Sequence, residues 1–113
     1  MKNTVSMKNF EFKKVYKNSK SVANNLLILY TLEGAHITEN KLGICASKTV
    51  GNSIIRHRAT RLIRESYRLM EDKIKPNVYI VVIARKNIID KNCMEVKSAL
   101  YHLLKKADLL VND

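Results

Sequence analysis

The sequence predicts a mixed fold, α+β or α/β, in which helices pack against one sheet. Three segments repeat apolar residues at helical spacing, and the run VYIVVIA at 78–84 is almost continuously apolar. A further run, SVANNLLILYTL at 21–32, is rich in β-forming residues. The resulting order of helix, strands, helix, strand and helix is typical of helices layered on a sheet. With 113 residues the chain is long enough for one core, so we expect a single domain over residues 1–113.

Residues 9–17 are predicted to form a short amphipathic helix, because Phe12, Val15 and Tyr16 recur at i, i+3 and i+4. The run at 21–32 then predicts one or two strands, with an irregularity at its two consecutive asparagines. Side chains alternate along a strand, so this run has two faces. They are Leu27, Leu29 and Thr31 on one side, and Leu26, Ile28, Tyr30 and Leu32 on the other.

The segment KLGICASK at 41–48 predicts another strand, with Leu42, Ile44 and Ala46 on one face. Together with the strand run before it, this segment suggests an antiparallel hairpin closed by a loop of about five to eight residues. A central helix is expected to follow and to continue to about residue 72. The strand at 78–84 comes next, and its apolar residues favour burial on both faces.

Asparagines are the candidate caps of all three helices, because their side chains accept hydrogen bonds from free backbone N–H groups. Asn9 is the candidate for the first helix, and Asn52 or Ser53 for the central one. Asn92 precedes Glu95 by three residues, which is the spacing of a capping box. The last helix then presents an apolar face made of Val96, Ala99, Leu100, Leu103, Leu104 and Ala107.

The composition points to an anionic partner. A net charge of +11 and a pI of about 9.8 exceed what solubility requires, and nucleic acid is the usual partner of such a protein. A membrane is the competing target, but no stretch approaches the roughly 20 apolar residues of a spanning helix. The N-terminus lacks the apolar run of a secretory signal. The two cysteines, Cys45 and Cys93, form no zinc-binding pattern. We therefore expect a cytoplasmic protein.

Five of the six arginines fall within residues 48–68, KTVGNSIIRHRATRLIRESYR. On a helical wheel they lie on one side, together with His57, while Ile55, Ala59, Leu62, Ser66 and Met70 lie on the other. The simplest alternative is a solvated face with internal ion pairs, but Glu65 is the one acid in this stretch. Arginine forks two hydrogen bonds onto a phosphate, so contact with nucleic acid is the favoured interpretation. A helix-turn-helix or basic zipper is less favoured, since no short helix precedes this one and no heptads follow it.

This stretch resembles the signature of the bacterial ribonuclease P protein component, K-x-x-G-N-x-x-x-R-N-R-x-K-R-x-x-R. Two positions depart from it: His57 replaces the usual Asn, and Thr60 replaces the usual Lys. The resemblance extends to the first helix and strand, to VYIVVIARK and to the last helix, and so covers nearly the whole chain. The matching positions are Lys48, Gly51, Asn52, Arg56, Arg58, Arg61 and Arg64.

The resemblance implies an α-β-β-β-α-β-α two-layer sandwich of the ribosomal protein S5 domain 2-like type, with a left-handed βαβ crossover. It also implies a protein subunit that is not the catalyst. A large RNA subunit, with Mg²⁺, would hydrolyse the phosphodiester that joins the 5′ leader to the mature part of precursor tRNA. The protein would assist by binding both that RNA subunit and the leader.

The resemblance further assigns residues to the two RNA contacts. The RNA subunit would be bound by Lys48, Gly51, Asn52, Arg56, His57, Arg58, Arg61, Arg64 and Arg68. The leader would be bound in a cleft between the first helix and the sheet by Phe12, Tyr16, Lys17, Tyr30, Arg85 and Lys86, and Lys13 and Lys20 could line the same groove. No catalytic residue and no metal ligand is assigned to the protein, no DNA or membrane partner is expected, and the protein alone is expected to be a monomer.

Two rival functions remain open at this point. A self-sufficient enzyme would need a nucleophile with its base, or paired carboxylates, and the spacing of His36, His57 and His102 brings no such pair together. A generic RNA-binding or ribosome-associated protein cannot be distinguished by charge alone.

Overall fold

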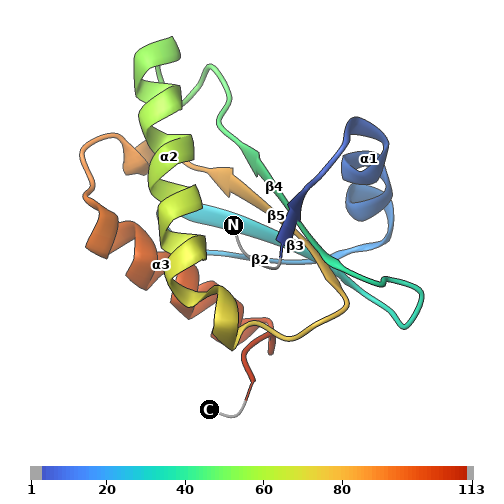
Figure 1. Cartoon of the computed structure of the whole chain (residues 1–113). Coiled ribbons are helices and arrows are strands. Elements are labelled where there is room, and N and C mark those ends of the chain that lie inside the picture. Colours follow the sequence, from blue (N-terminus) through green and yellow to red (C-terminus); the bar gives the residue numbers. More distant parts are fainter. Residues whose placement is uncertain (1–3, 112–113) are drawn as a thin grey trace.

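The centre of the molecule is a five-stranded sheet, seen in the computed structural model, which describes residues 4–111 (Figure 1). The strands are β1 (Thr4–Ser6), β2 (Lys20–Ala23), β3 (Leu27–Glu33), β4 (Asn40–Cys45) and β5 (Val78–Ala84), in the order β1-β4-β5-β3-β2. The helices are α1 (Asn9–Asn18), α2 (Ser53–Met70) and α3 (Cys93–Lys106), with short 3-10 turns η1 (Glu71–Lys73) and η2 (Lys86–Ile88). The predicted mixed fold is therefore confirmed.

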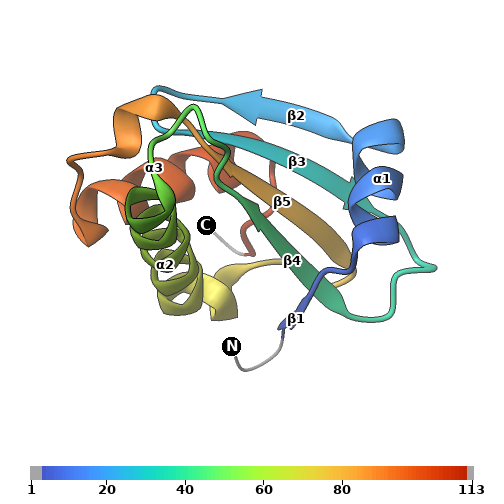
Figure 2. The same ribbon diagram turned by 90° about the horizontal axis from the view of Figure 1, so that it is seen from above.

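The helices lie on both faces of the sheet (Figures 1 and 2). Helices α2 and α3 cover one face and enclose the main core, which includes the fully buried Leu29, Ile80 and Leu100. Helix α1 lies alone on the opposite face, over a smaller core that contains Val15 and Val81. Consecutive residues of β5 thus serve different cores, which explains why that strand is apolar on both sides.

The predicted hairpin between the runs at 21–32 and 41–48 is wrong. Strand β5 lies between β3 and β4, antiparallel to the first (Leu29 opposite Val82) and parallel to the second (Leu42 opposite Ile80). A strand that is apolar on both faces is best buried at the centre of a sheet, where both of its edges are also paired. That long-range preference prevails over pairing between neighbours in sequence.

The two parallel strands β4 and β5 are joined through α2. Figures 1 and 2 together show that this crossover is left-handed, as the resemblance implied and against the usual rule. Strand β1 was not expected from the sequence, because three residues are too few for a pattern. It extends the sheet beside β4 in parallel, and the Thr4 hydroxyl lies 3.0 Å from the Tyr67 hydroxyl of α2.

Two of the three cap assignments are confirmed. The side chains of Asn52 and Asn92 accept hydrogen bonds from the third residue of their helices, and Glu95 completes the capping box. The assignment of Asn9 is wrong, because the cap position of α1 is Lys8. There the carboxylate of Glu11 accepts a hydrogen bond from the Lys8 backbone N–H at 2.8 Å, so an acid at the third position protects the free amide.

Candidate nucleic-acid interface

Helix α2 presents an exposed cationic stripe on the side that faces away from the core. We call it the arginine face: His57, Arg61, Arg64 and Arg68, at i, i+4, i+7 and i+11. Within residues 4–111, no carboxylate lies within ion-pairing distance of Arg61 or Arg64. These two guanidinium groups therefore keep their full hydrogen-bonding capacity for a ligand with phosphate groups.

The buried side of α2 is broader than the helical wheel indicated. Ala59, Ser66 and Met70 are buried as predicted, but Ile63 and Tyr67 are also fully buried. On the wheel these two residues flank the position of Arg56, which is therefore half-buried, and its Nε atom has no hydrogen-bond partner within the described chain. Arg56 thus lies at the edge of the core, apart from the arginine face.

Arg58 and Arg68 already have partners in the protein. Arg58 donates from Nη1 to the carbonyl of Ile89 at 3.2 Å and from Nη2 to that of Lys91 at 2.8 Å, so it ties α2 to the segment before α3. Arg68 is paired with Glu65, and this contact holds the pKa of Glu65 below its usual range. The expectation that the arginines largely lack partners therefore holds best for Arg61 and Arg64.

The start of α2 is shaped by two residues of the matching motif. Gly51 has a φ of +155°, and a Cβ added there would lie 2.9 Å from the Ile55 side chain, so a larger residue would be strained. Asn52 then caps the helix by accepting from the N–H of Ile55 at 3.0 Å. Lys48 is exposed in the preceding turn, so it adds its charge at the positive end of the helix dipole.

Three aromatic rings form a cluster between α1 and the other face of the sheet. We call Phe12, Tyr16 and Tyr30 the aromatic cluster. Tyr16 stands edge-on to Tyr30 at 5.1 Å between ring centroids, and Phe12 lies 6.4 Å from Tyr16. Tyr16 is 43% exposed, so one ring of the cluster is open to a ligand while Phe12 and Tyr30 are half-buried. Burial, together with the hydrogen bond to Cys45, raises the pKa of Tyr16.

The position of Phe12 explains a glycine in the strand beneath it. A Cβ added at Gly43 of β4 would lie 2.4 Å from the Phe12 ring. The ring therefore rests directly on the backbone of the sheet, and α1 approaches more closely than a side chain would allow. Phe12 is mainly a packing residue, and Tyr16 is the exposed ring of the cluster, with Tyr30 half-buried beside it.

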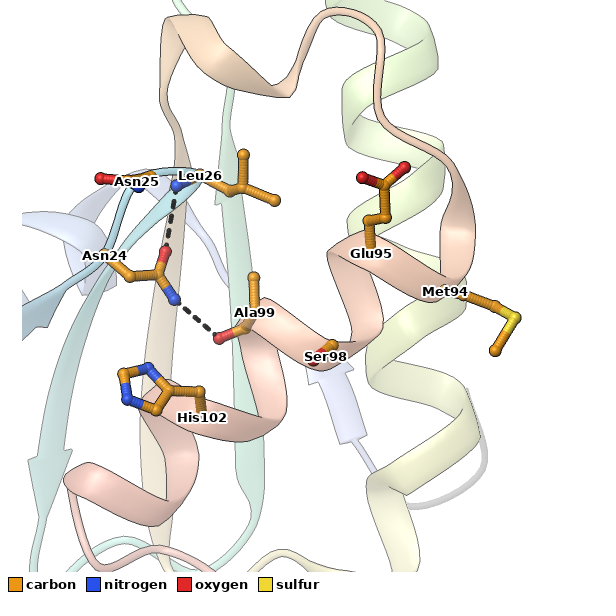
Figure 3. A pocket seen from close by; sticks show the side chains of 8 residues that line it. All are labelled: Asn24, Asn25, Leu26, Met94, Glu95, Ser98, Ala99 and His102. Atoms are coloured by element: carbon orange, nitrogen blue, oxygen red, sulfur yellow. Dashed lines mark hydrogen bonds between the residues drawn. The ribbon is translucent and has the colours of Figure 1, made fainter.

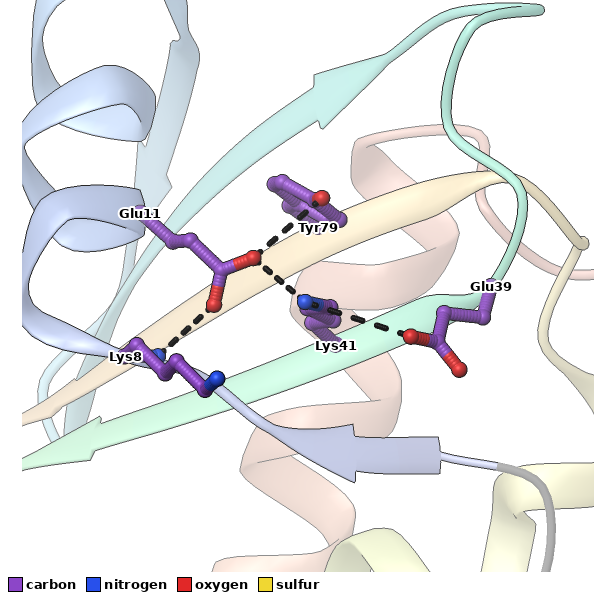
Figure 4. A network of polar contacts seen from close by, with 5 residues as sticks. All are labelled: Lys8, Glu11, Glu39, Lys41 and Tyr79. Carbon is purple, nitrogen blue, oxygen red and sulfur yellow. Dashed lines mark hydrogen bonds and ion pairs between the residues drawn. The ribbon is translucent and has the colours of Figure 1, made fainter.

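A buried carboxylate fixes α1 to the sheet (Figure 4). Glu11 of α1 is 3% exposed, and its Oε2 atom lies 2.5 Å from Nζ of Lys41 on β4 and 3.4 Å from the hydroxyl of Tyr79 on β5. Burial acts to raise the pKa of Glu11, but the hydrogen bonds from Lys41 and from the backbone of Lys8 outweigh it and hold the pKa below its usual range. Glu39 adds a weaker contact to Lys41 at 3.9 Å.

This network was not foreseen from the sequence. The one available signal was a single acid in a helix that otherwise carries lysines and aromatic residues, NFEFKKVYKN. Its partners on β4 and β5 lie 30 and 68 residues away, and only the strand register brings them together.

The basic residues assigned to the leader cleft do not all lie beside the aromatic cluster. Lys17 is exposed on α1, close to the cluster in sequence and on the same helix. Arg85 and Lys86 follow β5 at the end of the sheet remote from α1 (Figure 2). There Arg85 donates to the carbonyl of Asn24 at 2.9 Å. Lys20 begins β2 at the sheet edge and is exposed.

A hollow of about 550 Å³ lies between the β2–β3 turn and α3 (Figure 3). Asn24 spans it, donating from Nδ2 to the carbonyl of Ala99 at 3.0 Å and accepting from the N–H of Leu26 at 3.1 Å. The lining residues include Glu95 and His102 but neither arginine nor lysine, so the hollow lacks the cations that phosphate groups require.

The family-level comparison decides which class of protein carries these surfaces. A model of the ribonuclease P family matches residues 1–108. This chain belongs to the ribonuclease P protein family. The ribonuclease P protein component of Alkaliphilus oremlandii is 48% identical over 103 residues, covering 91% of this chain and 90% of its own. That of Clostridium botulinum strain 657 is 44% identical over 110 residues, covering 96% and 98%.

Solved structures of ribonuclease P proteins share the fold. The protein from Staphylococcus aureus superimposes with a TM-score of 0.83 at 33% identity, covering 97% of this chain and 99% of its own. That from Thermotoga maritima gives 0.76 at 26% identity, covering 85% and 90%. As a ribonuclease P protein, the chain is part of a ribonucleoprotein endoribonuclease, partners the ribonuclease P RNA and acts in processing the 5′ leader of tRNA. A generic RNA-binding function is not favoured.

Within residues 4–111, no three side chains of His, Cys, Asp or Glu come close enough together to hold a metal ion. No helix in the same range is long and apolar enough to cross a membrane.

Proposed function

We propose that the chain holds the two RNAs of ribonuclease P on opposite faces of its sheet. The arginine face, with Lys48 and the capped start of α2, binds the RNA subunit. The aromatic cluster binds the 5′ leader of precursor tRNA. The observation that carries this proposal is the separation of the two surfaces, since α2 and α1 lie on opposite sides of the sheet (Figure 1).

The chemistry of each surface suits a different kind of RNA. Arg61 and Arg64 stand exposed and without acidic partners in the described chain, which suits the phosphates of a structured RNA. Tyr16 and Tyr30 offer ring faces and edges beside the exposed Lys17, which suits a single strand whose bases are free to stack. In this proposal the leader supplies that single strand.

The cleavage chemistry, in this proposal, is performed on the RNA subunit with Mg²⁺ held mainly by that RNA. Mg²⁺ prefers carboxylate and phosphate oxygens, and the surfaces described above are lined by cations and aromatic rings. We therefore assign the Mg²⁺ to the RNA subunit and not to the arginine face or the aromatic cluster. We further propose that the protein alone is a monomer, since its charge of +11 opposes self-association. In the same proposal the chain is a single domain that works in the cytoplasm.

The experiment is a reconstitution at low Mg²⁺. Adding this protein to a bacterial ribonuclease P RNA should rescue cleavage of precursor tRNA, and more strongly when the leader is several nucleotides long. The double substitution Arg61→Ala with Arg64→Ala should weaken binding of the RNA subunit by at least about tenfold. The slope of log binding constant against log salt concentration should fall in magnitude by roughly one to two. Tyr30→Ala should leave that binding intact and weaken binding of the precursor.

The matched control is Lys97→Ala with Lys105→Ala on α3, which removes the same charge from another exposed surface. If this control weakened RNA-subunit binding as much as the arginine pair, binding would follow net charge and the assignment of α2 would be wrong. Rescue failing with RNA binding intact would instead leave a generic RNA-binding protein.

A further inference from the structure

Helix α1 has an outward side of which the proposed leader contact uses only Lys17. Its residues Phe10, Lys13, Lys14 and Lys17 recur at i, i+3, i+4 and i+7 and form one exposed stripe, here called the outer stripe. Phe10 is 67% exposed. Within residues 4–111, α1 is the only helix on its face of the sheet (Figure 1), and all four residues of the stripe are exposed.

A single exposed apolar residue is ordinary on a protein surface, so exposure alone indicates nothing. Phe10 differs through its surroundings. Its neighbours along the stripe are three lysines, and the one acid of α1, Glu11, points inward to Lys41 (Figure 4). An aromatic ring among cations offers a stacking face together with charges for the flanking phosphates, which is the combination that binds single-stranded nucleic acid.

The outer stripe is continuous with the aromatic cluster. Around the helix, at about 100° per residue, Tyr16 is followed by Lys13, then Lys17, then Phe10. Along the helix, Phe10 lies six residues before Tyr16, or about 9 Å at 1.5 Å per residue. A strand that stacks at Tyr16 and continues outward to the Phe10 ring therefore passes Lys13, while Lys17 lies just beyond Tyr16 along the helix axis.

We propose that the outer stripe extends the leader-binding surface over α1, so that nucleotides beyond those at the aromatic cluster stack on Phe10. This inference rests on the proposed leader contact at Tyr16 and Tyr30. The occupant is single-stranded RNA because the lysines require an anion and the ring requires an accessible base face. Base-paired RNA keeps its base faces stacked within the helix.

The test uses the reconstituted ribonucleoprotein and two precursor tRNAs, one with a leader that reaches only the aromatic cluster and one longer by several nucleotides. Phe10→Ala should weaken binding of the long-leader precursor by about five- to tenfold and leave the short-leader precursor unchanged. Phe10→Trp should restore the affinity, because a larger ring stacks at least as well. Met94→Ala is the control, since Met94 is 81% exposed on α3, on the other face of the sheet.

Each other outcome has a definite meaning. Equal losses for both leaders, or weaker binding of the RNA subunit alone, would overturn the inference and place Phe10 against the RNA subunit. Loss with Tyr30→Ala but none with Phe10→Ala would overturn the inference and leave the proposed leader contact standing. If neither variant affects either precursor, the proposed leader contact itself is wrong.

Discussion

The arginine face and the aromatic cluster are built in opposite ways. The arginine face comes from one helix, and its geometry follows from the sequence spacing once α2 is formed and capped. The aromatic cluster needs α1 and β3, and the Glu11 network that positions α1 needs β4 and β5 as well. A charged surface can therefore be specified locally, whereas an aromatic groove depends on tertiary packing.

The two regions also differ in how they are anchored. Helix α2 places Ile63 and Tyr67 in the main core, and burial raises the pKa of Tyr67 to about 12. Helix α1 contributes Val15 to a small core and relies on Glu11 for its second attachment. We expect α1 to open at lower free energy than α2, because fewer apolar contacts hold it.

The largest expected effect tests the anchoring of α2. Ile63→Ala removes a fully buried side chain from the main core and should lower the free energy of unfolding by about 2–5 kcal/mol. Urea titration measures this loss. If Ile63→Ala lowers the free energy of unfolding no more than Val15→Ala on α1 does, α2 is not held more firmly than α1 and the proposed difference is wrong.

The second prediction tests the anchoring of α1. Glu11→Gln keeps the shape of the side chain but removes the charge that faces Lys41, so it should destabilise the protein less than Ile63→Ala does. The folded-state pKa of Glu11 lies below its unfolded value, so the carboxylate stabilises the fold above the unfolded pKa. This contribution is lost as the pH falls through the lowered pKa of the folded state.

Urea titrations between about pH 7 and pH 3 should therefore show the wild type and Glu11→Gln converging in stability at the acid end. Hydrogen exchange at neutral pH should show faster exchange in α1 and little change in α2. A uniform change across both helices would mean that Glu11 supports the whole fold and not one helix.

The third prediction tests whether Arg58 of α2 holds the helix to the segment before α3 or binds the RNA subunit. Arg58→Lys keeps the charge but cannot hold the carbonyls of Ile89 and Lys91 together, so the free energy of unfolding should fall by about 1 kcal/mol. Binding of the RNA subunit should change little at constant salt. A large loss of binding with unchanged stability would return Arg58 to the arginine face.

The smallest effect concerns the ion pair between Glu65 and Arg68 of the arginine face. Glu65→Gln frees Arg68 from its partner, so binding of the RNA subunit should tighten by about two- to fivefold. The salt dependence of binding should become steeper, by up to about one in slope. Filter binding over a series of salt concentrations measures both quantities. Weaker binding would show that Glu65 positions Arg68 for its ligand.

The sequence was most informative where a property is local. The strand at 78–84, the caps Asn52 and Asn92, and the division of α2 into two sides all follow from residues near one another. The false hairpin depends on β5 lying beside β4, and the Glu11–Lys41 pair depends on α1 lying over β4; no spacing shows either arrangement. The half-buried position of Arg56 was missed for a related reason, since burial depends on what packs against a helix and not on its charge pattern.

The left-handed crossover from β4 through α2 to β5 has a consequence for how the two RNAs are bound. With the same strand order and directions, a right-handed passage from β4 to β5 would place α2 on the face that α1 occupies. Both RNAs would then compete for one side of the protein. The left-handed crossover instead places α2 and α1 on opposite faces of the sheet. Under the proposed assignment, the RNA subunit and the precursor tRNA can therefore be bound at the same time.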